Sequence, residues 1–230
     1  MNQDNAEPIH MQGPVCPIPH QQTETIVMGH GSGGQMTHDL IQNIFHARIG
    51  NSFLAEGNDA ARVFLTDLSE QISISTDSHV VSPIFFPGGD IGRLAVCGTV
   101  NDVAMLGASP AFLTAGFIIE EGFAMASLGR IVDSMAIACQ EAGVKIVAGD
   151  TKVVEKGNAD GVYINTTGFG SILKGHRIGG QYAEPGDAIL ISGTIGDHGI
   201  AVLHARGDLG FESHIQSDVA PLNKIIIKLL

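Results

Sequence analysis

Apolar residues recur along this chain with two spacings, and these predict alternating helices and strands. Helical spacing predicts helices from Met36 to about Arg48, over 91–106, over 125–142 and after residue 197. Alternation and short apolar runs predict strands over 71–76 (with a continuation over 80–86), 111–119, 144–148, 161–172 and 188–192. The strand over 144–148 is expected to be short and buried.

Two of these helices carry clear end signals. Asp90 directly precedes the helix that starts at Ile91, and aspartate is a favoured N-cap residue. Gly107 and Pro110 then stop that helix, because glycine suits the position after a helix and proline cannot continue one. The helix over 125–142 is closed in the same way by Gly143.

The pattern divides the chain into three parts. Residues 1–22 are polar with four prolines and are predicted to be a flexible leader. Residues 23–180 form a first domain. Near residue 180 a strand, a glycine-rich loop and a helix begin again, but 181–230 is too short for a core of ordinary size. We therefore expect 181–230 to be the start of a truncated second domain.

Composition narrows the classes of function. The 230 residues are 44% hydrophobic and 16% charged, which is typical of a packed globular protein, and the net charge is −12. Such a charge would repel a nucleic-acid backbone, although it is compatible with a nucleotide that brings Mg²⁺. No apolar run is long enough to span a membrane. The spacing of Cys16, Cys97 and Cys139 fits neither a disulfide framework nor a zinc site, and favours the cytoplasm.

Three aspartates stand out from their surroundings. Asp77, Asp102 and Asp150 each lie where an apolar element ends or is interrupted, with small residues beside them. A carboxylate in apolar sequence costs free energy unless something pairs with it, and Lys and Arg are few here. Mg²⁺ prefers oxygen ligands and commonly binds substrate phosphates as well. The three aspartates therefore predict a magnesium and phosphate site.

Each aspartate also has an ordinary structural interpretation. Asp77 and Asp150 are placed at the ends of strands, where open sheets bind ligands, but either could form a local Asx-turn. Asp102 either lies on one stripe of its helix with Ala95 and Gly98, or caps a second short helix after a kink. The sequence alone does not decide between these alternatives.

Two further segments carry candidate chemistry. Lys152 would share a side of the strand with Asp150, where it either binds a phosphate or pairs with Asp150 or Glu155. The glycine-rich run Gly29–Gly34 precedes a helix and either presents N–H groups to an anion or forms a tight turn. It matches neither a P-loop nor a dinucleotide fingerprint. His30 within it is either a proton carrier or structural.

Several motifs together resemble one family. They are HGSGG, STDSHVVSPIFFPGGDIGRLAVCGTVNDVAMLGASP, EEG, AGDTKVVEKG and GTIGDHG. Over residues 26–230 the chain resembles the HypE family of hydrogenase maturation factors. This family belongs to the PurM-like superfamily of aminoimidazole ribonucleotide synthetase, selenophosphate synthetase and thiamine-monophosphate kinase. The resemblance implies an α/β (α+β) domain with a mixed sheet flanked by helices, which dimerises into a β-barrel.

The resemblance also implies a function in the maturation of nickel–iron hydrogenase. Such proteins use ATP and Mg²⁺ to dehydrate a carboxamide on their C-terminal cysteine to a thiocyanate, which supplies the cyanide ligand of the iron. HypF installs the carboxamide, and the HypC–HypD complex receives the cyanide. This chain ends at KIIIKLL without a terminal cysteine, so we expect it not to complete the dehydration.

The site residues that the resemblance implies fall into three groups. The metal ligands are Asp77, Asp102, Asp150 and Asp59, the last lying in EGNDAAR where relatives have a second aspartate in place of Asn58. The nucleotide-binding residues are Gly31, Gly33, Gly34, Asn101, Asp102, Asp150 and Thr151. The catalytic residues are Lys152 and His30.

Two other functions are kept as alternatives. One is a phosphotransferase like selenophosphate synthetase, which uses a reactive N-terminal cysteine with a lysine nearby, whereas Cys16 has no such lysine. The other is a non-catalytic dimeric scaffold that docks HypF or HypC–HypD.

Overall fold

The computed structural model describes two units of the chain. The described residues are 34–46, 54–57, 61–64, 71–176, 178–208, 210 and 214–230. Met1–Asn51 and Ser52–Leu230 are separate units. In the first, α1 (Gln35–Leu40) continues as a π-helical segment (Ile41–His46), so the helix predicted from Met36 is present up to His46. The predicted leader lies outside the described residues.

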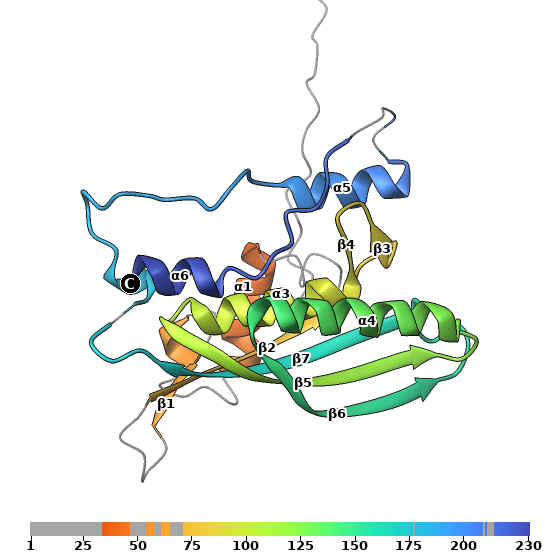
Figure 1. Cartoon of the computed structure of the whole chain (residues 1–230), viewed down its shortest axis with the longest axis horizontal. Helices are drawn as coiled ribbons and strands as arrows, with labels where there is room; N and C mark the ends of the chain where they lie inside the picture. The colour runs from red at the N-terminus through yellow and green to blue at the C-terminus, as the bar shows by residue number, and fades with distance from the viewer. Residues whose placement is uncertain are drawn as a thin grey trace, which may run out of the picture. The chain divides into compact units, whose positions relative to one another are not determined.

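The second unit is built on a five-stranded mixed sheet (Figure 1). Its strands are β1 (Ala61–Phe64), β2 (Gln71–His79), β5 (Ala108–Glu120), β6 (Lys145–Val154) and β7 (Val162–Ile172). Their order is β1-β2-β7-β5-β6, and only the β5–β6 pair is parallel. A small hairpin joins β3 (Phe85–Phe86) to β4 (Gly89–Asp90).

Helices cover one face of this sheet. Figure 1 shows α3 (Ile91–Ala104), α4 (Met125–Ala142), α5 (Asp197–Arg206) and α6 (Asn223–Leu229) on the same side of the strands. Single 3₁₀ turns occupy Leu54–Glu56 and Gly180–Tyr182. The main core lies between the sheet and helices α3 and α4; its largest fully buried side chains include Ile91, Leu113, Ile131, Met135 and Ile164. The predicted mixed α/β fold is confirmed.

The predicted helix ends are confirmed as well. Oδ1 of Asp90 accepts hydrogen bonds from the N–H groups of Gly92 (2.7 Å) and Arg93 (3.0 Å). Helix α4 ends at Gly143, whose φ of 78° is the left-handed conformation that glycine adopts without strain. None of the helices in the described ranges has the length and hydrophobicity that crossing a bilayer requires.

The cap at Asp90 gives a first prediction. Asp90→Ala leaves two N–H groups at the start of α3 without their acceptor, so we expect the free energy of unfolding to fall by about 1 kcal/mol. Urea unfolding followed by circular dichroism measures this loss. Asp90→Ser keeps an acceptor and should recover most of it; equal losses in both variants would contradict a capping role.

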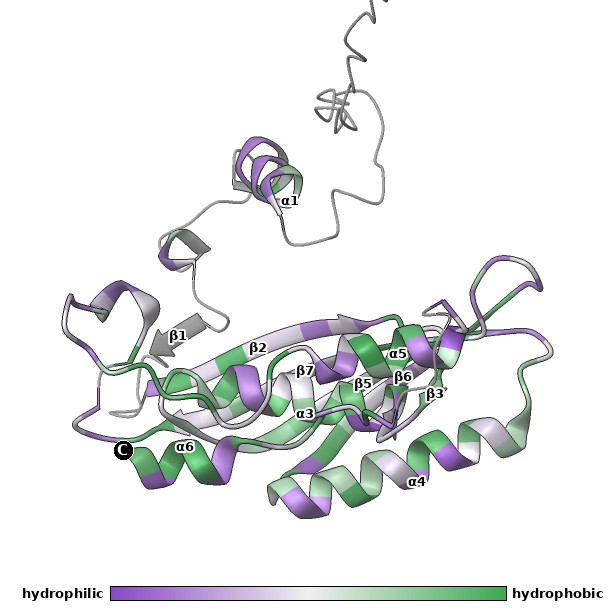
Figure 2. Cartoon of the chain, turned by 90° about the horizontal axis from the view of Figure 1, so that it is seen from above, coloured by the Kyte–Doolittle hydropathy of each residue, from purple (hydrophilic) through white to green (hydrophobic). Residues whose placement is uncertain are grey.

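Strand β2 buries its polar side. Ser73 and Ser75 are buried, and Ser75 donates to Asp102 on α3, so this side of β2 faces the helices. Ile72 and Ile74 point to the opposite face and are only partly buried. Figure 2 shows the same mixture of hydrophobic and hydrophilic stretches along the strands. The isoleucines of β2 thus lie on the face of the sheet that no helix covers. Apolar side chains on such a face indicate that another protein surface packs against it.

Three predicted strands and the placement of two aspartates need correction. Asp77 and Asp150 do not follow strands, since they lie inside β2 and β6. The strand predicted over 144–148 is instead the ten-residue β6, which is exposed because it lies at the edge of the sheet. Residues 80–86 give only the two-residue β3. Residues 188–192 form no strand, and Ile189 and Leu190 are exposed, since no described strand pairs with them.

The segment that leads into α6 is bound to helices α3 and α4. Arg93 donates from Nε to the carbonyl of Val219 (3.2 Å). The Asn101 amide donates to the carbonyl of Ala220 (3.0 Å) and accepts from the N–H of Leu222 (2.7 Å). Nδ2 of Asn223 donates to the carbonyl of Ala142. These bonds hold the segment within the Ser52–Leu230 unit, and the boundary expected near residue 180 stays a prediction.

Candidate functional site

Asp77 presents an oriented carboxylate on the helix-facing side of β2. Its Oδ1 accepts a hydrogen bond from the N–H of Ser78 (2.8 Å). Its Oδ2 lies 3.5 Å from Nε2 of His79, and the Asp77 side chain is 43% exposed. The carboxylate is therefore held at Oδ1 by a main-chain donor, while part of it stays open to a ligand.

Asp102 faces the same side of β2 from helix α3. Its Oδ2 accepts a hydrogen bond from Oγ of Ser75 (3.1 Å), two residues before Asp77 on the strand. Because Asp102 lies inside α3, the alternative of a second helix starting after a kink is wrong. Gly98, one turn earlier, lies opposite Asp77 and His79. The predicted stripe of small residues thus lets β2 approach α3, and it brings Asp77 and Asp102 to neighbouring positions.

Asp150 lies on the other face of the sheet. Across the strands, Asp150 is in register with Gly116, Gly116 with Asn165, and Asn165 with Ser78. Residues in register share a face of the sheet, and Ser78 points away from the face of its neighbour Asp77. Asp150 therefore lies on the face opposite Asp77. Two strands, β7 and β5, separate β2 from β6, a distance of about 14 Å between the outer strands. The three aspartates therefore do not converge within one chain, contrary to our expectation.

Asp150 and Lys152 bind each other instead. Nζ of Lys152 donates to both carboxylate oxygens of Asp150, at 2.6 and 2.8 Å, and both side chains are exposed. The hydrogen bond from Lys152 lowers the pKa of Asp150. Among the residues that the structure describes, no three His, Cys, Asp or Glu side chains are grouped so that they could hold a metal ion.

The other predicted site residues lie apart from the Asp77 and Asp102 pair or outside the described ranges. Asn101 uses its whole amide to bind the main chain of Ala220 and Leu222. Thr151 is in register with Phe117 at the edge of the sheet, and Gly34 is exposed at the start of α1. His30, Gly31, Gly33 and Asp59 fall on residues that the structure does not describe.

Two residues near Asp77 were not predicted from the sequence. Ser75 binds Asp102, and His79 lies buried beside Asp77 in contact with Thr166 on β7. The pKa of His79 is lowered, because the effect of burial exceeds the opposing effect of the negative charge of Asp77. The alternation of Ser73, Ser75, Asp77 and His79 along one strand was the signal that could have identified them.

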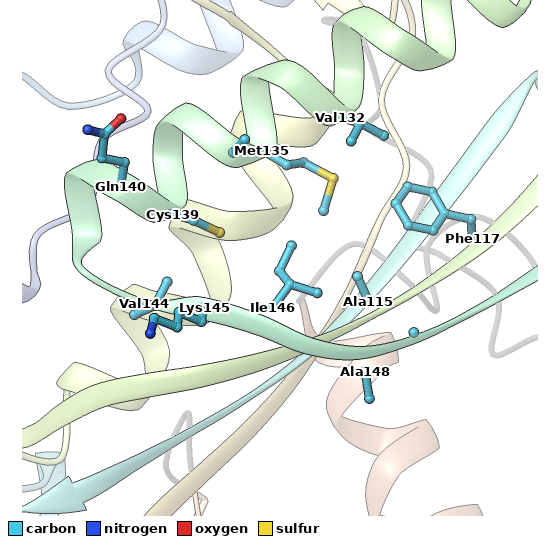
Figure 3. A pocket seen from close by; sticks show the side chains of 12 residues that line it. Ala115, Phe117, Val132, Met135, Cys139, Gln140, Val144, Lys145, Ile146 and Ala148 are labelled. Carbon is cyan, nitrogen blue, oxygen red and sulfur yellow. The ribbon is translucent and has the colours of Figure 1, made fainter.

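A separate cavity lies between α4 and strands β5 and β6 (Figure 3). Its volume is about 770 Å³. Met135 and Cys139 reach into it from α4, and Phe117 and Ile146 from the strands. Its lining is mainly apolar and contains none of the predicted site residues. The cavity is therefore a poor match for phosphate, and the site is better placed at Asp77 and Asp102.

Known proteins resemble this chain closely. Residues 57–172 match the family described as AIR synthase related protein, N-terminal domain. A carbamoyl dehydratase HypE from Cupriavidus necator is 55% identical over 205 residues, which cover 89% of this chain and 58% of that protein. The carbamoyl dehydratase HypE of Escherichia coli K12 is 47% identical over 204 residues, covering 87% of this chain and 61% of that protein.

Solved structures agree with these relatives. A crystal structure of a HypE–HypF complex superposes with a TM-score of 0.77 at 57% identity, covering 83% of this chain and 61% of that chain. A crystal structure of HypE in complex with ATP gives 0.67 at 53% identity, covering 90% and 61%. This chain spans 58% and 61% of the length of the two curated relatives named above. The chain belongs to the AIR synthase related family and, within it, to the HypE proteins.

Proposed function

We propose that this chain is the nucleotide-binding part of a carbamoyl dehydratase, and that it binds ATP with Mg²⁺ beside Asp77 and Asp102. The observation that carries the proposal is that both carboxylates lie on one side of β2, where Asp102 binds Ser75, two residues before Asp77 on the same strand. A relative 53% identical has been crystallised with ATP, which supports the nucleotide.

The residues present fit a magnesium ion that arrives with a nucleotide. Mg²⁺ is usually held by one or two carboxylates, with phosphate oxygens and water completing its shell. Asp77 and Asp102 supply two carboxylates, and Asp77 is accessible. Bound there, the ion would neutralise charge on the phosphates. Asp59 remains a predicted ligand, whereas Asp150 lies on the opposite face of the sheet and cannot reach this ion within one chain.

The proposed reaction removes water from a carboxamide. The amide oxygen attacks the γ-phosphorus of ATP and displaces ADP. Phosphate then leaves with that oxygen while nitrogen loses two protons, which gives the carbon–nitrogen triple bond of a thiocyanate. Phosphorylation matters because oxide is a poor leaving group and phosphate a good one. Lys152 was predicted to neutralise the phosphate, but it pairs with Asp150 on the face of the sheet opposite Asp77, so it cannot do so at this site within one chain. Thr151, His30, Gly31, Gly33 and Gly34 stay predicted contacts.

Nucleotide binding tests this proposal. Asp77→Asn keeps the shape of the side chain and removes its charge, so we expect Mg²⁺·ATP to bind roughly tenfold more weakly or worse, since contacts with charged groups contribute about 1.5–3 kcal/mol. Binding of ATP in EDTA should change little. Calorimetry of the purified chain measures both. Asp133→Asn, which removes an exposed carboxylate on α4, is the matched control; equal behaviour of the two variants would refute the metal assignment.

We further propose a homodimer that forms through the uncovered face of the sheet. Ile74, Phe169 and Phe112 are in register across β2, β7 and β5 on that face. Ile118 lies on the same face, and Phe112 and Ile118 are 47% and 44% exposed. Two sheets packed face to face would bury these side chains in a shared interior, as a barrel requires.

The proposed partners follow the family. A relative 57% identical has been crystallised with HypF, which supports HypF as a partner, and HypC–HypD is proposed as the acceptor of the cyanide. We place the protein in the cytoplasm, where its buried Cys97 and Cys139 would stay reduced. Burial raises the pKa of the Cys97 thiol to about 11, which further protects it from oxidation.

A further inference from the structure

We propose that His79 is a positioning residue for Asp77, and that its Nε2–H group holds the carboxylate in the orientation in which it meets the metal. This inference rests on the proposed function, because it concerns how Asp77 binds Mg²⁺. His79 itself is buried, with a side chain 5% exposed, so it acts through Asp77.

The hydrogen bonds around Thr166 decide which nitrogen of His79 carries a proton. The hydroxyl of Thr166 has one hydrogen, and it donates this to the carbonyl of Ala95 (3.0 Å). Toward Oγ1 of Thr99 (2.6 Å) and Nε2 of His79 (3.5 Å), the Thr166 oxygen can therefore only accept. Nε2 of His79 must then carry the hydrogen.

The same nitrogen also lies near the carboxylate. Oδ2 of Asp77 lies 3.5 Å from Nε2 and, as an ionised oxygen, accepts only. Oδ1 already accepts from the N–H of Ser78 (2.8 Å). Oδ1 is thus fixed by a main-chain donor, and Oδ2 lies within ion-pair distance of the His79 imidazole, while the Asp77 side chain stays 43% exposed. Metal-binding carboxylates are commonly held by such outer donors.

The lack of a side chain at Gly98 leaves room for the His79 imidazole and the Asp77 carboxylate. A Cβ atom added there would lie 3.0 Å from Cε1 of His79 and 3.3 Å from Oδ2 of Asp77. These separations are shorter than ordinary contacts, so an alanine would displace the imidazole or the carboxylate. Gly98→Ala therefore perturbs the same pair from the opposite element without changing either side chain.

The test measures how strongly ATP binding depends on magnesium. For each variant of the full chain, calorimetry gives the ATP dissociation constants in EDTA and in Mg²⁺. The constant in EDTA divided by the constant in Mg²⁺ measures how much magnesium strengthens binding, and this ratio is compared between variants. We expect His79→Leu to reduce this ratio by roughly tenfold or more, as loss of an outer partner commonly weakens metal binding 10–100-fold. Gly98→Ala should reduce it as well. His79→Gln keeps an N–H donor and should recover part of the ratio.

Ser73→Ala is the matched control. Ser73 is buried on the same side of the same strand, and its hydroxyl bonds no other described group, so the ratio should not change. Melting temperatures are recorded for all variants. A ratio that stays at the wild-type value in both His79→Leu and Gly98→Ala overturns the positioning role, even where the melting temperature falls.

Asp77→Asn separates this inference from the function on which it rests. If Asp77→Asn abolishes the magnesium dependence while both His79→Leu and Gly98→Ala keep it, Asp77 binds the metal and the positioning role is wrong. If Asp77→Asn also keeps it, the proposed metal site itself fails. Should His79→Leu not fold, Gly98→Ala and His79→Gln still decide the outcome.

Discussion

Gly92→Ala is expected to lower the free energy of unfolding by about 3 kcal/mol, at the upper end of the cost of overpacking a core. A Cβ atom at this position would lie 2.4 Å from the carbonyl oxygen of Ile131 and 2.9 Å from Cγ of Met135. The nearest atom belongs to the main chain of α4, so it cannot rotate away as a side chain would. Helices α3 and α4 would have to separate, and buried contacts along both would be lost. Urea unfolding monitored by circular dichroism measures the change.

Gly129→Ala is the control for this prediction. Gly129 lies inside α4, and a Cβ atom there would meet nothing within 4 Å. Alanine favours a helix over glycine by about 0.5–1 kcal/mol, so this variant should be slightly more stable than the wild type. The same substitution is thus expected to have opposite signs in two adjacent helices. A small stabilisation at both positions would show that α3 and α4 are not in close contact at Gly92.

Phe112→Asp is expected to convert the proposed dimer into a monomer. Phe112 lies on the uncovered face, in register with Phe169 on β7 and Lys145 on β6. Lys145 lies beside this position, but removing a carboxylate and an ammonium from water costs more than their attraction commonly returns, so we expect the dimer to weaken by roughly a hundredfold or more. Sedimentation velocity over a range of protein concentrations measures the dissociation constant.

Val132→Asp provides the matched comparison. Val132 and Phe112 are both 47% exposed, but Val132 lies on α4, on the opposite side of the sheet. Its substitution should leave the dimer unchanged, because α4 is outside the proposed interface. Circular dichroism of both variants establishes that the fold is kept. Dimers that survive Phe112→Asp and dissociate in Val132→Asp would place the interface on the helices.

The sequence predicts those features that depend on neighbours along the chain. The bounds of α4 and the start of α3 were both predicted, because Asp90 and Gly143 act on main-chain groups within one turn. The stripe of Ala95, Gly98 and Asp102 was one of two interpretations that the sequence left open, because helical spacing places these residues on one side only if the helix continues. In each case the physical cause lies within a few residues.

Features that depend on distant strands could not be predicted in this way. Residues 144–148 and 188–192 are similar apolar runs, yet within the described ranges only the first pairs with another strand. Asp77 and Asp150 have similar local sequences, but strand order and side-chain alternation place them on opposite faces. No local signal contains that information, so the predicted convergence of the aspartates was wrong for a single chain.

Strand β2 shows a second limit. A hydrophobic pattern normally assigns isoleucines to the core, yet Ser73 and Ser75 face the helices here. Small polar side chains suit that side because α3 approaches it through Gly98, and because Asp102 needs a donor. Close packing against α3 therefore outweighs the usual preference for burying isoleucines. His79 was not predicted as a site residue because it lies on this same polar side of β2.

The attachment of the last helix has a consequence for sequence variation. Arg93 and Asn101 bind main-chain atoms of Val219, Ala220 and Leu222, and every amino acid supplies the carbonyl groups. The side chains at 220 and 222 can therefore be replaced without loss of these bonds, except that proline at 222 has no N–H, whereas Val219 also packs against the core. The side chains that make these bonds belong to α3, so substitution of Arg93 or Asn101 is the change that would weaken the attachment of α6.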